Sequence, residues 1–249
     1  MTSGIPEIGR DKGLTAQEYA YARLRNAIIT GAIAPGTALT VRGLAAELAT
    51  SQTPIREAVR RLCSENAIEV LGNRRLRVPE MNPGRFEELV QLRIVLECHA
   101  ARRALPHVSA VMVEELAAID QRMDAAVAAL DLDALTMLNH EFHRALYTLN
   151  PDQAVMPLIE SIWLQLGPFQ RQVIRNVETY YEIDHHKQML AALHARDLAA
   201  LIGAVESDIR DGILVSGRQL LADAGVAGGD APPIIGAGMD QTAPSGASA

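Results

Sequence analysis

The sequence predicts a mainly α-helical protein, in which an N-terminal winged helix-turn-helix is followed by an all-helical bundle of about six helices. Two observations support this fold class. Residues 41–62 have the pattern of two short helices joined by a tight turn, with a helix before them and a β-hairpin after them. Beyond Pro79 and Pro83, which break both strand and helix, apolar residues recur only at helical spacing.

The helix-turn-helix is defined by two apolar stripes. Leu44, Ala45 and Leu48 form the first, and residues 55, 58, 59 and 62 form the second. We expect Thr53 to cap the second helix and Pro54 to occupy its first position, where a missing N–H costs nothing.

Polar side chains remain on the outward face near the start of this second helix. They are Gln52, Thr53, Arg56 and Arg60. Hydrogen-bond donors at the start of a helix can reach base edges in the major groove of DNA, whereas an ordinary helical hairpin with a solvated face is the competing interpretation.

The flanking segments complete a winged helix. Residues 21–29 form an amphipathic helix that ends at Gly31, and residues 67–71 and 75–78 form short strands around the turn Gly72-Asn73. Arg74, Arg75 and Arg77 then lie on or beside the wing. Residues 1–78 contain 11 Lys and Arg against 7 Asp and Glu, whereas residues 79–249 contain 12 against 23, so the positive charge gathers at the winged-helix end.

At this point the sequence resembles the GntR family of bacterial transcription regulators. The resemblance rests on Leu24-Arg25 with Ile28-Ile29, Gly31-x-Ile33-x-Pro35-Gly36, Arg42-x-Leu44-Ala45, and Thr53-Pro54-Ile55-Arg56-Glu57-Ala58 with Leu62. The resemblance implies that Arg42, Thr53 and Arg56 contact DNA and that the wing tip near Asn73 enters the minor groove. The family usually has Arg in place of Gln52 and Gly in place of Arg75. Since Gln favours adenine where Arg favours guanine, the operator is expected to differ from common family sites.

Breaks in the apolar pattern set the expected domain limits. We expect a flexible arm over residues 1–12, the winged helix over 13–78, a linker over 79–83, the bundle over 84–222 and a disordered tail over 223–249. Pro168 should kink or split the fourth bundle helix. With no signal peptide and no long uncharged apolar run, a soluble cytoplasmic protein with no membrane partner is expected.

Four polar residues interrupt the apolar stripes of the bundle. Asn139 and His143 lie four apart on the inward face of one helix, and His186 and Asp208 point inward from the two helices of a hairpin. His140 and His185 fall on outer faces. Because buried polar groups need partners, these four should meet one another or a shared ligand. Two imidazoles, a carboxylate and an amide oxygen suit a divalent metal such as Zn²⁺, Ni²⁺ or Mn²⁺, and a metal-free effector pocket is the alternative.

This region resembles the FCD ligand-binding domain of the FadR-type branch of the same family. The resemblance rests on Leu92-Arg93 with Leu96-Glu97, Phe142-His143, and His186 followed by Leu190. Such domains typically bind a metal through one Asp and three His, in the places of Asn139, His143, His186 and Asp208. Two of the four ligands therefore differ here, although the formal charge of the set is unchanged.

Arg93 is a further charged residue on an apolar helix face. It can pair with Glu97 one turn later, or it can anchor the carboxylate of an effector, since Arg binds carboxylates bidentately.

The sequence therefore predicts a dimeric transcription regulator that binds double-stranded operator DNA and responds to a small organic acid. Two alternatives stay open: a metal-dependent enzyme that uses the His, His and carboxylate core to hold a catalytic iron, and a DNA-binding protein whose bundle only dimerises.

Overall fold

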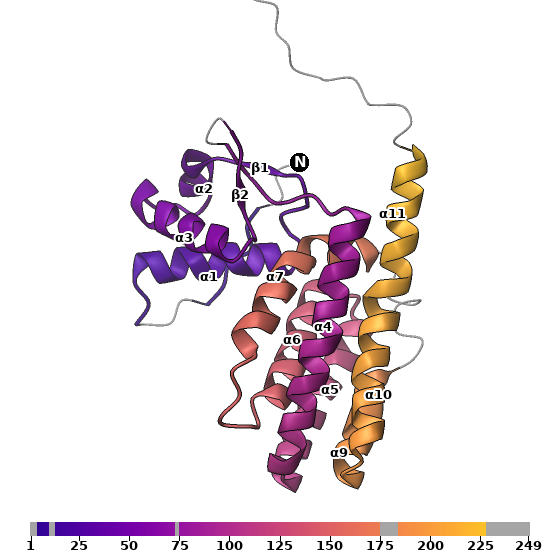
Figure 1. The fold of residues 1–249 in the computed structure, drawn as a ribbon. Coiled ribbons are helices and arrows are strands. Elements are labelled where there is room, and N and C mark those ends of the chain that lie inside the picture. The colour runs from indigo at the N-terminus through magenta and orange to yellow at the C-terminus, as the bar shows by residue number, and fades with distance from the viewer. Residues whose placement is uncertain (1–3, 10–12, 73–74, 175–183, 228–249) are drawn as a thin grey trace, which may run out of the picture.

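The structure, a computed structural model, describes residues 4–9, 13–72, 75–174 and 184–227. These residues form a small head, made of residues 13–78, that lies across one end of a bundle of long helices (Figure 1). Within the described ranges, no helix combines the length and the apolar character needed to cross a membrane.

The head is a winged helix-turn-helix. Its elements are α1 (Ala16–Ile29), β1 (Ala38–Leu39), α2 (Val41–Glu47), α3 (Gln52–Ser64), β2 (Glu69–Val70) and β3 (Leu76–Arg77). The three strands form an antiparallel sheet in the order β1-β3-β2, and β1 was not expected from the sequence. A capping box between Thr15 and Glu18 starts α1. Gly31, at φ +70°, ends the turn that follows α1.

Helix α3 begins earlier than the sequence suggested. Ser51 is its N-cap, so the expectation that Thr53 caps the helix is wrong by two residues. Pro54 is tolerated at the third helical position because the first N–H groups of a helix have no intrahelical partner. The buried stripe is the predicted one: Ile55, Ala58, Val59 and Leu62.

Residues 4–9 do not form a loose arm. Ile5 is buried, and its N–H donates to the Glu47 carboxylate at 2.6 Å. Arg23, itself buried, donates to the backbone carbonyls of Ile5 and Pro6. The expectation of a flexible segment is therefore wrong for this part of the chain.

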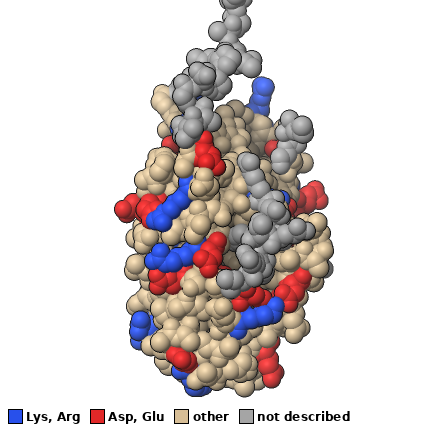
Figure 2. All heavy atoms as spheres, turned by 90° about the vertical axis from the view of Figure 1, so that its right-hand side faces the viewer, with Lys and Arg blue, Asp and Glu red and all other residues tan. Residues whose placement is uncertain are grey.

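The bundle follows the expected helix order with shifted boundaries. Its elements are α4 (Pro83–Ala104), η1 (Leu105–His107), α5 (Ala110–Ala128), α6 (Leu132–Tyr147), α7 (Met156–Val173), α9 (His185–Ala195), α10 (Leu198–Ile209), the π-helical turn η2 (Arg210–Leu214) and α11 (Val215–Ala227). Helix α7 runs through Pro168 without a break, so the expected split is absent from it. Helix α11 ends at Ala227, beyond the residue 222 boundary expected for the bundle. Acidic and basic side chains are interspersed on the face of the molecule on the α11 side (Figure 2).

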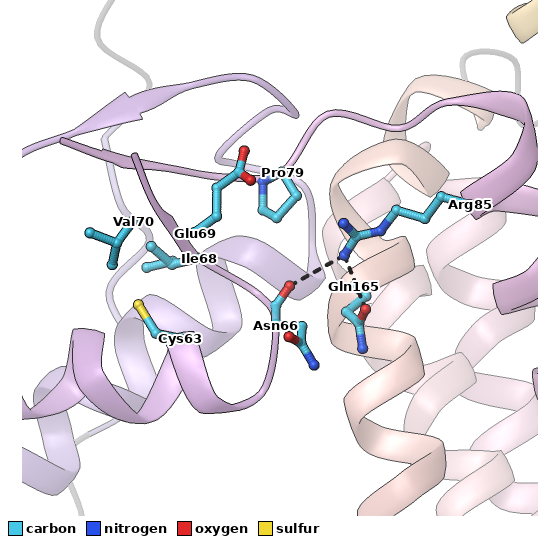
Figure 3. Close-up of a pocket in the computed structure, with 8 residues that line it drawn as sticks. All are labelled: Cys63, Asn66, Ile68, Glu69, Val70, Pro79, Arg85 and Gln165. Atoms are coloured by element: carbon cyan, nitrogen blue, oxygen red, sulfur yellow. Dashed lines mark hydrogen bonds between the residues drawn. The ribbon is translucent and has the colours of Figure 1, made fainter. Parts of the chain in front are cut away.

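The head is held against the bundle mainly by α7. Helix α1 packs on α7, and Gly167 of α7 is so close to the backbone of Ile29 that an added Cβ would lie 2.5 Å from its carbonyl oxygen. At the base of the wing, Arg85 from the start of α4 donates to the Asn66 carbonyl at 3.5 Å and to Gln165 of α7 at 3.1 Å (Figure 3). The head and the bundle therefore share a close-packed contact.

Candidate functional site

The outward face of the helix-turn-helix carries the polar residues that the sequence placed there. Arg42 of α2 and the α3 residues Gln52, Thr53, Arg56 and Arg60 are all exposed. The Arg56 guanidinium donates to the Gln52 amide oxygen at 3.1 Å, and Arg60 pairs with Glu57 at 3.0 Å. Gln52 therefore orients Arg56, a relation that the sequence analysis did not anticipate.

The structure describes the wing only in part. Asn73 and Arg74 lie outside the described residues, and Arg75, directly before β3, is exposed. Arg77, by contrast, is paired with Glu69 at 2.7 Å and with Glu80 at 2.9 Å. Its charge is thus already compensated at the base of the wing.

The structure brings the four polar residues of the bundle together. His143 of α6, His186 of α9 and Asp208 of α10 offer ligand atoms that all lie within 4.8 Å of one another. His143 Nε2 is 3.1 Å from Asp208 Oδ2, and His186 Nε2 is 4.0 Å from Asp208 Oδ1. Asn139 completes the group, since its side-chain amide is 3.2 Å from His186 Nε2.

A buried network fixes the orientation of His143. Its Nδ1 lies 2.9 Å from the Tyr147 hydroxyl, which donates to Glu97 at 2.8 Å. Since the hydroxyl hydrogen is used on Glu97, the hydroxyl must accept from Nδ1–H, which in the neutral imidazole leaves the lone pair of His143 on Nε2. That Nε2 is buried and, despite its distance to Asp208, is not aligned for a hydrogen bond with any described residue. Metal-ligating histidines in proteins are commonly oriented in this way, with one ring nitrogen fixed by a hydrogen bond and the other left for the ion.

Glu97 is the centre of this network and was missed as a functional residue. It is fully buried and accepts from Trp163 Nε1 at 2.8 Å and from Arg93 Nε at 2.6 Å, besides Tyr147. The spacing of four between Arg93 and Glu97, and between His143 and Tyr147, was the available signal in the sequence.

Arg93 points inward and forms the internal pair that was one of its two expected roles. Burial alone would lower the pKa of Arg93, but the adjacent Glu97 and Asp208 raise it, so the side chain is charged. Its Nε is used on Glu97, and no hydrogen bond from its Nη groups to a described residue is seen. The pair with Glu97 does not by itself assign an effector contact.

Two histidines expected on outer faces are in fact buried. His140 stacks on Trp163 with ring centroids 4.7 Å apart, and burial holds its pKa well below the usual value. The Nδ1 atom of His185 lies 3.2 Å from the Gln188 side-chain oxygen, and its Nε2 lies 2.8 Å from Asp211 of the π-helical turn. These positions are covered because α6 and α9 are each enclosed on more than one side, so that more than a single stripe is hidden.

The electrostatics of the polar core suit a cation. Burial lowers the pKa of His186 to about 4, so its imidazole is neutral at pH 7. Burial alone would raise the pKa of Asp208, but nearby positive charge, including that of Arg93, lowers the pKa below its ordinary value, so the carboxylate is ionised. Neutral imidazoles with one carboxylate are ligands that Zn²⁺, Ni²⁺ and Mn²⁺ accept. The Nε2 of His143, which has no hydrogen-bond partner within the described part of the chain, fits such an ion. The Asn139 amide has its nitrogen toward His186, and a rotation by 180° would present its oxygen instead.

Comparison with known proteins identifies both parts of the chain. Residues 16–78 match the description "Bacterial regulatory proteins, gntR family", and residues 88–211 match the FCD domain. The chain belongs to the GntR family. It is similar to the HTH-type transcriptional regulator McbR of Escherichia coli, with 28% identity over 78% of this chain and 89% of that protein. It is also similar to the gluconate operon transcriptional repressor of Bacillus subtilis, with 26% identity over 80% of this chain and 84% of that one.

The fold agrees with this assignment. The solved structure of McbR/YncC from E. coli superimposes with a TM-score of 0.77 at 26% identity, over 83% of this chain and 99% of that one. This GntR-family chain, with its helix-turn-helix and FCD bundle, is therefore a DNA-binding transcription regulator and not an enzyme. The catalytic-iron alternative is set aside by these relatives.

Proposed function

We propose that this regulator binds a palindromic operator as a homodimer and that a divalent metal in the polar core, together with a small carboxylate effector, tunes the operator affinity. The observation that carries the proposal is the buried Nε2 of His143, which has no hydrogen-bond partner among the described residues. It faces Asp208 and His186 inside the domain that the family uses for effectors. An imidazole kept in one tautomer by Tyr147 and Glu97 is costly to bury unless it has a further partner.

Recognition of DNA is assigned to the exposed start of α3. Arg56, oriented by Gln52, is the donor best placed to reach a guanine edge, while the Gln52 amide nitrogen stays available for a neighbouring base. Thr53, Arg42 and Arg60 are placed for base or phosphate contacts, and Asn73, Arg74 and Arg75 are proposed for the wing. One head reads only a short half-site, so two copies joined through the bundle (residues 84–222) are needed for specificity.

The residues around Arg93 support a carboxylate as the effector class. A metal ion and a charged guanidinium in one core both attract an anion, and a carboxylate can use an oxygen for each. The name of one relative associates it with a gluconate operon, and gluconate is itself a carboxylate. The effector can change DNA affinity only by binding one arrangement of the two heads more tightly than the other.

The test is a two-stage titration of full-length, tag-free protein. An operator is selected from a random DNA pool, and its affinity is measured by fluorescence anisotropy with chelator-treated protein, with added Zn²⁺, Ni²⁺ or Mn²⁺, and with a panel of small carboxylates that includes gluconate. We expect operator affinity to change about 5- to 150-fold, the usual range of allosteric coupling, only when metal and the active carboxylate are both present.

Other outcomes separate the alternatives. A carboxylate that acts equally well after chelation would show a metal-free pocket. Operator binding that no metal or carboxylate alters would leave the bundle as a dimerisation domain only. In the His143→Ala variant the metal-dependent part of the response should disappear, while the affinity of the ligand-free protein for the operator stays the same.

A further inference from the structure

A second group of acidic residues lies on the other side of His186, away from His143. Asp120 and Asp124 are on successive turns of α5, and Asp184 is the N-cap of α9, which packs against α5. The three carboxylates converge on the ammonium of Lys187. Its Nζ is 2.6 Å from Asp184, 3.1 Å from both oxygens of Asp124 and 4.0 Å from Asp120.

Lys187 compensates this cluster incompletely. Three carboxylates against one ammonium leave a net charge of −2 when His186 is neutral. The Asp120 side chain is only 4% exposed, and its Oδ1 has no hydrogen-bond partner among the described residues. A buried carboxylate oxygen without a partner gains from either a proton or a cation.

We propose that Asp120, Asp124 and Asp184 form a second cation site, which binds a hard divalent ion such as Mg²⁺ or Mn²⁺ in the position marked by the Lys187 ammonium. Carboxylate oxygens are the ligands that these ions prefer, and water completes their coordination. Lys187 is 55% exposed, so its long side chain can swing into solvent and vacate the position.

The second site differs chemically from the polar core. The core offers two imidazole nitrogens and suits transition metals, whereas the second cluster offers oxygens. His186 lies between the two, with Nε2 toward the core and Nδ1 3.8 Å from Asp184. A neutral imidazole has one lone pair, so we assign His186 to the core and leave its Nδ1–H facing Asp184. The ion would therefore fix α5 to α9 directly behind a ligand of the core.

The experiment counts bound Mn²⁺ from the loss of the free-ion electron paramagnetic resonance signal in full-length protein. The His143→Ala background removes the core site and should retain one Mn²⁺ per chain. Adding Asp120→Asn should remove that ion, whereas adding Glu115→Gln, which neutralises an exposed carboxylate elsewhere on α5, should not. Lys187→Ala should tighten binding by about tenfold or more, because the competing ammonium is gone.

The results that would refute this second site differ from those that would refute a metal in the polar core. If only the core fails to bind metal, wild type and His143→Ala will bind the same number of Mn²⁺ ions, and Asp120→Asn will still remove one. The second site is refuted if His143→Ala protein binds no Mn²⁺ at millimolar concentrations, or if Asp120→Asn leaves the count unchanged. Weaker binding by Lys187→Ala would equally contradict it. Asp120→Asn removes a buried charge, so a folded variant is expected, and circular dichroism verifies this.

Discussion

Gly167 provides a sharp test of how the head is attached to the bundle. A Cβ at this position would lie 2.5, 2.7 and 2.9 Å from the carbonyl oxygen, Cα and carbonyl carbon of Ile29. All three are backbone atoms of α1, so no side chain can rotate away. Gly167→Ala must therefore push α1 and α7 apart.

The magnitude follows from two opposing terms. Overpacking by one methyl group costs about 1–3 kcal/mol, and replacing Gly with Ala inside a helix recovers up to about 1 kcal/mol. We expect a net destabilisation of about 1–2 kcal/mol for Gly167→Ala. Gly203 in α10 is the matched control, because a Cβ there would meet nothing within 4 Å. Gly203→Ala should stabilise the protein by about 0.5–1 kcal/mol.

Urea unfolding followed by two probes measures both effects. The protein has a single tryptophan, Trp163, so its fluorescence reports on the bundle core, while far-ultraviolet circular dichroism reports on all helices. In Gly167→Ala the circular dichroism transition should move to lower urea and begin before the fluorescence change, as the head loosens first. If Gly167→Ala were as stable as Gly203→Ala, the backbone contact between α1 and α7 would be wrong.

Three further predictions concern the DNA-binding face, the polar core and the second cation site. Arg56→Ala should lose about 1–3 kcal/mol of operator binding in anisotropy titrations, and unchanged affinity would show that another face of the head reads DNA. Tyr147→Phe removes the group that holds Nδ1–H of His143, so calorimetry should show metal affinity about 10- to 100-fold weaker, and wild-type affinity would refute the tautomer argument. Asp120 has a folded-state pKa near 6, above its ordinary 3.8, so the folded protein binds this proton more tightly than the unfolded chain and loses stability as pH rises through 6. Without divalent metal, Asp120→Asn should thus be more stable than wild type at pH 7.5 by about 1–2 kcal/mol, a figure reduced to allow for solvent screening by the exposed neighbours. The difference should shrink toward pH 4, and a difference independent of pH would contradict this prediction.

The sequence predicted the parts of the fold that rest on periodicity. The stripe of α3 and the inward positions of Asn139, His143 and His186 follow from helical spacing, because one face of each helix must be buried. The burial of Ile5 could not be predicted in this way, since it depends on a contact with Glu47 across 42 residues of sequence.

For a similar reason, the hydrogen-bond network of the polar core could be predicted only in part from the sequence. Glu97 collects hydrogen bonds from three helices, and no local pattern shows that Trp163 and Tyr147 converge on it. His140 was placed outside because a single stripe was assumed, whereas α6 packs against both α4 and α5 and hides a wider arc. Tertiary enclosure, and not helix spacing, decides such positions.

The central claim, that the polar core holds a metal, is tested most directly by elemental analysis of tag-free wild-type and His143→Ala protein purified side by side. Because Nε2 of His143 is a required ligand in this account, the wild type should contain one more equivalent of Zn, Ni or Mn per chain than the variant. Circular dichroism spectra should show that both proteins are folded. Equal metal contents in the two proteins would contradict the claim.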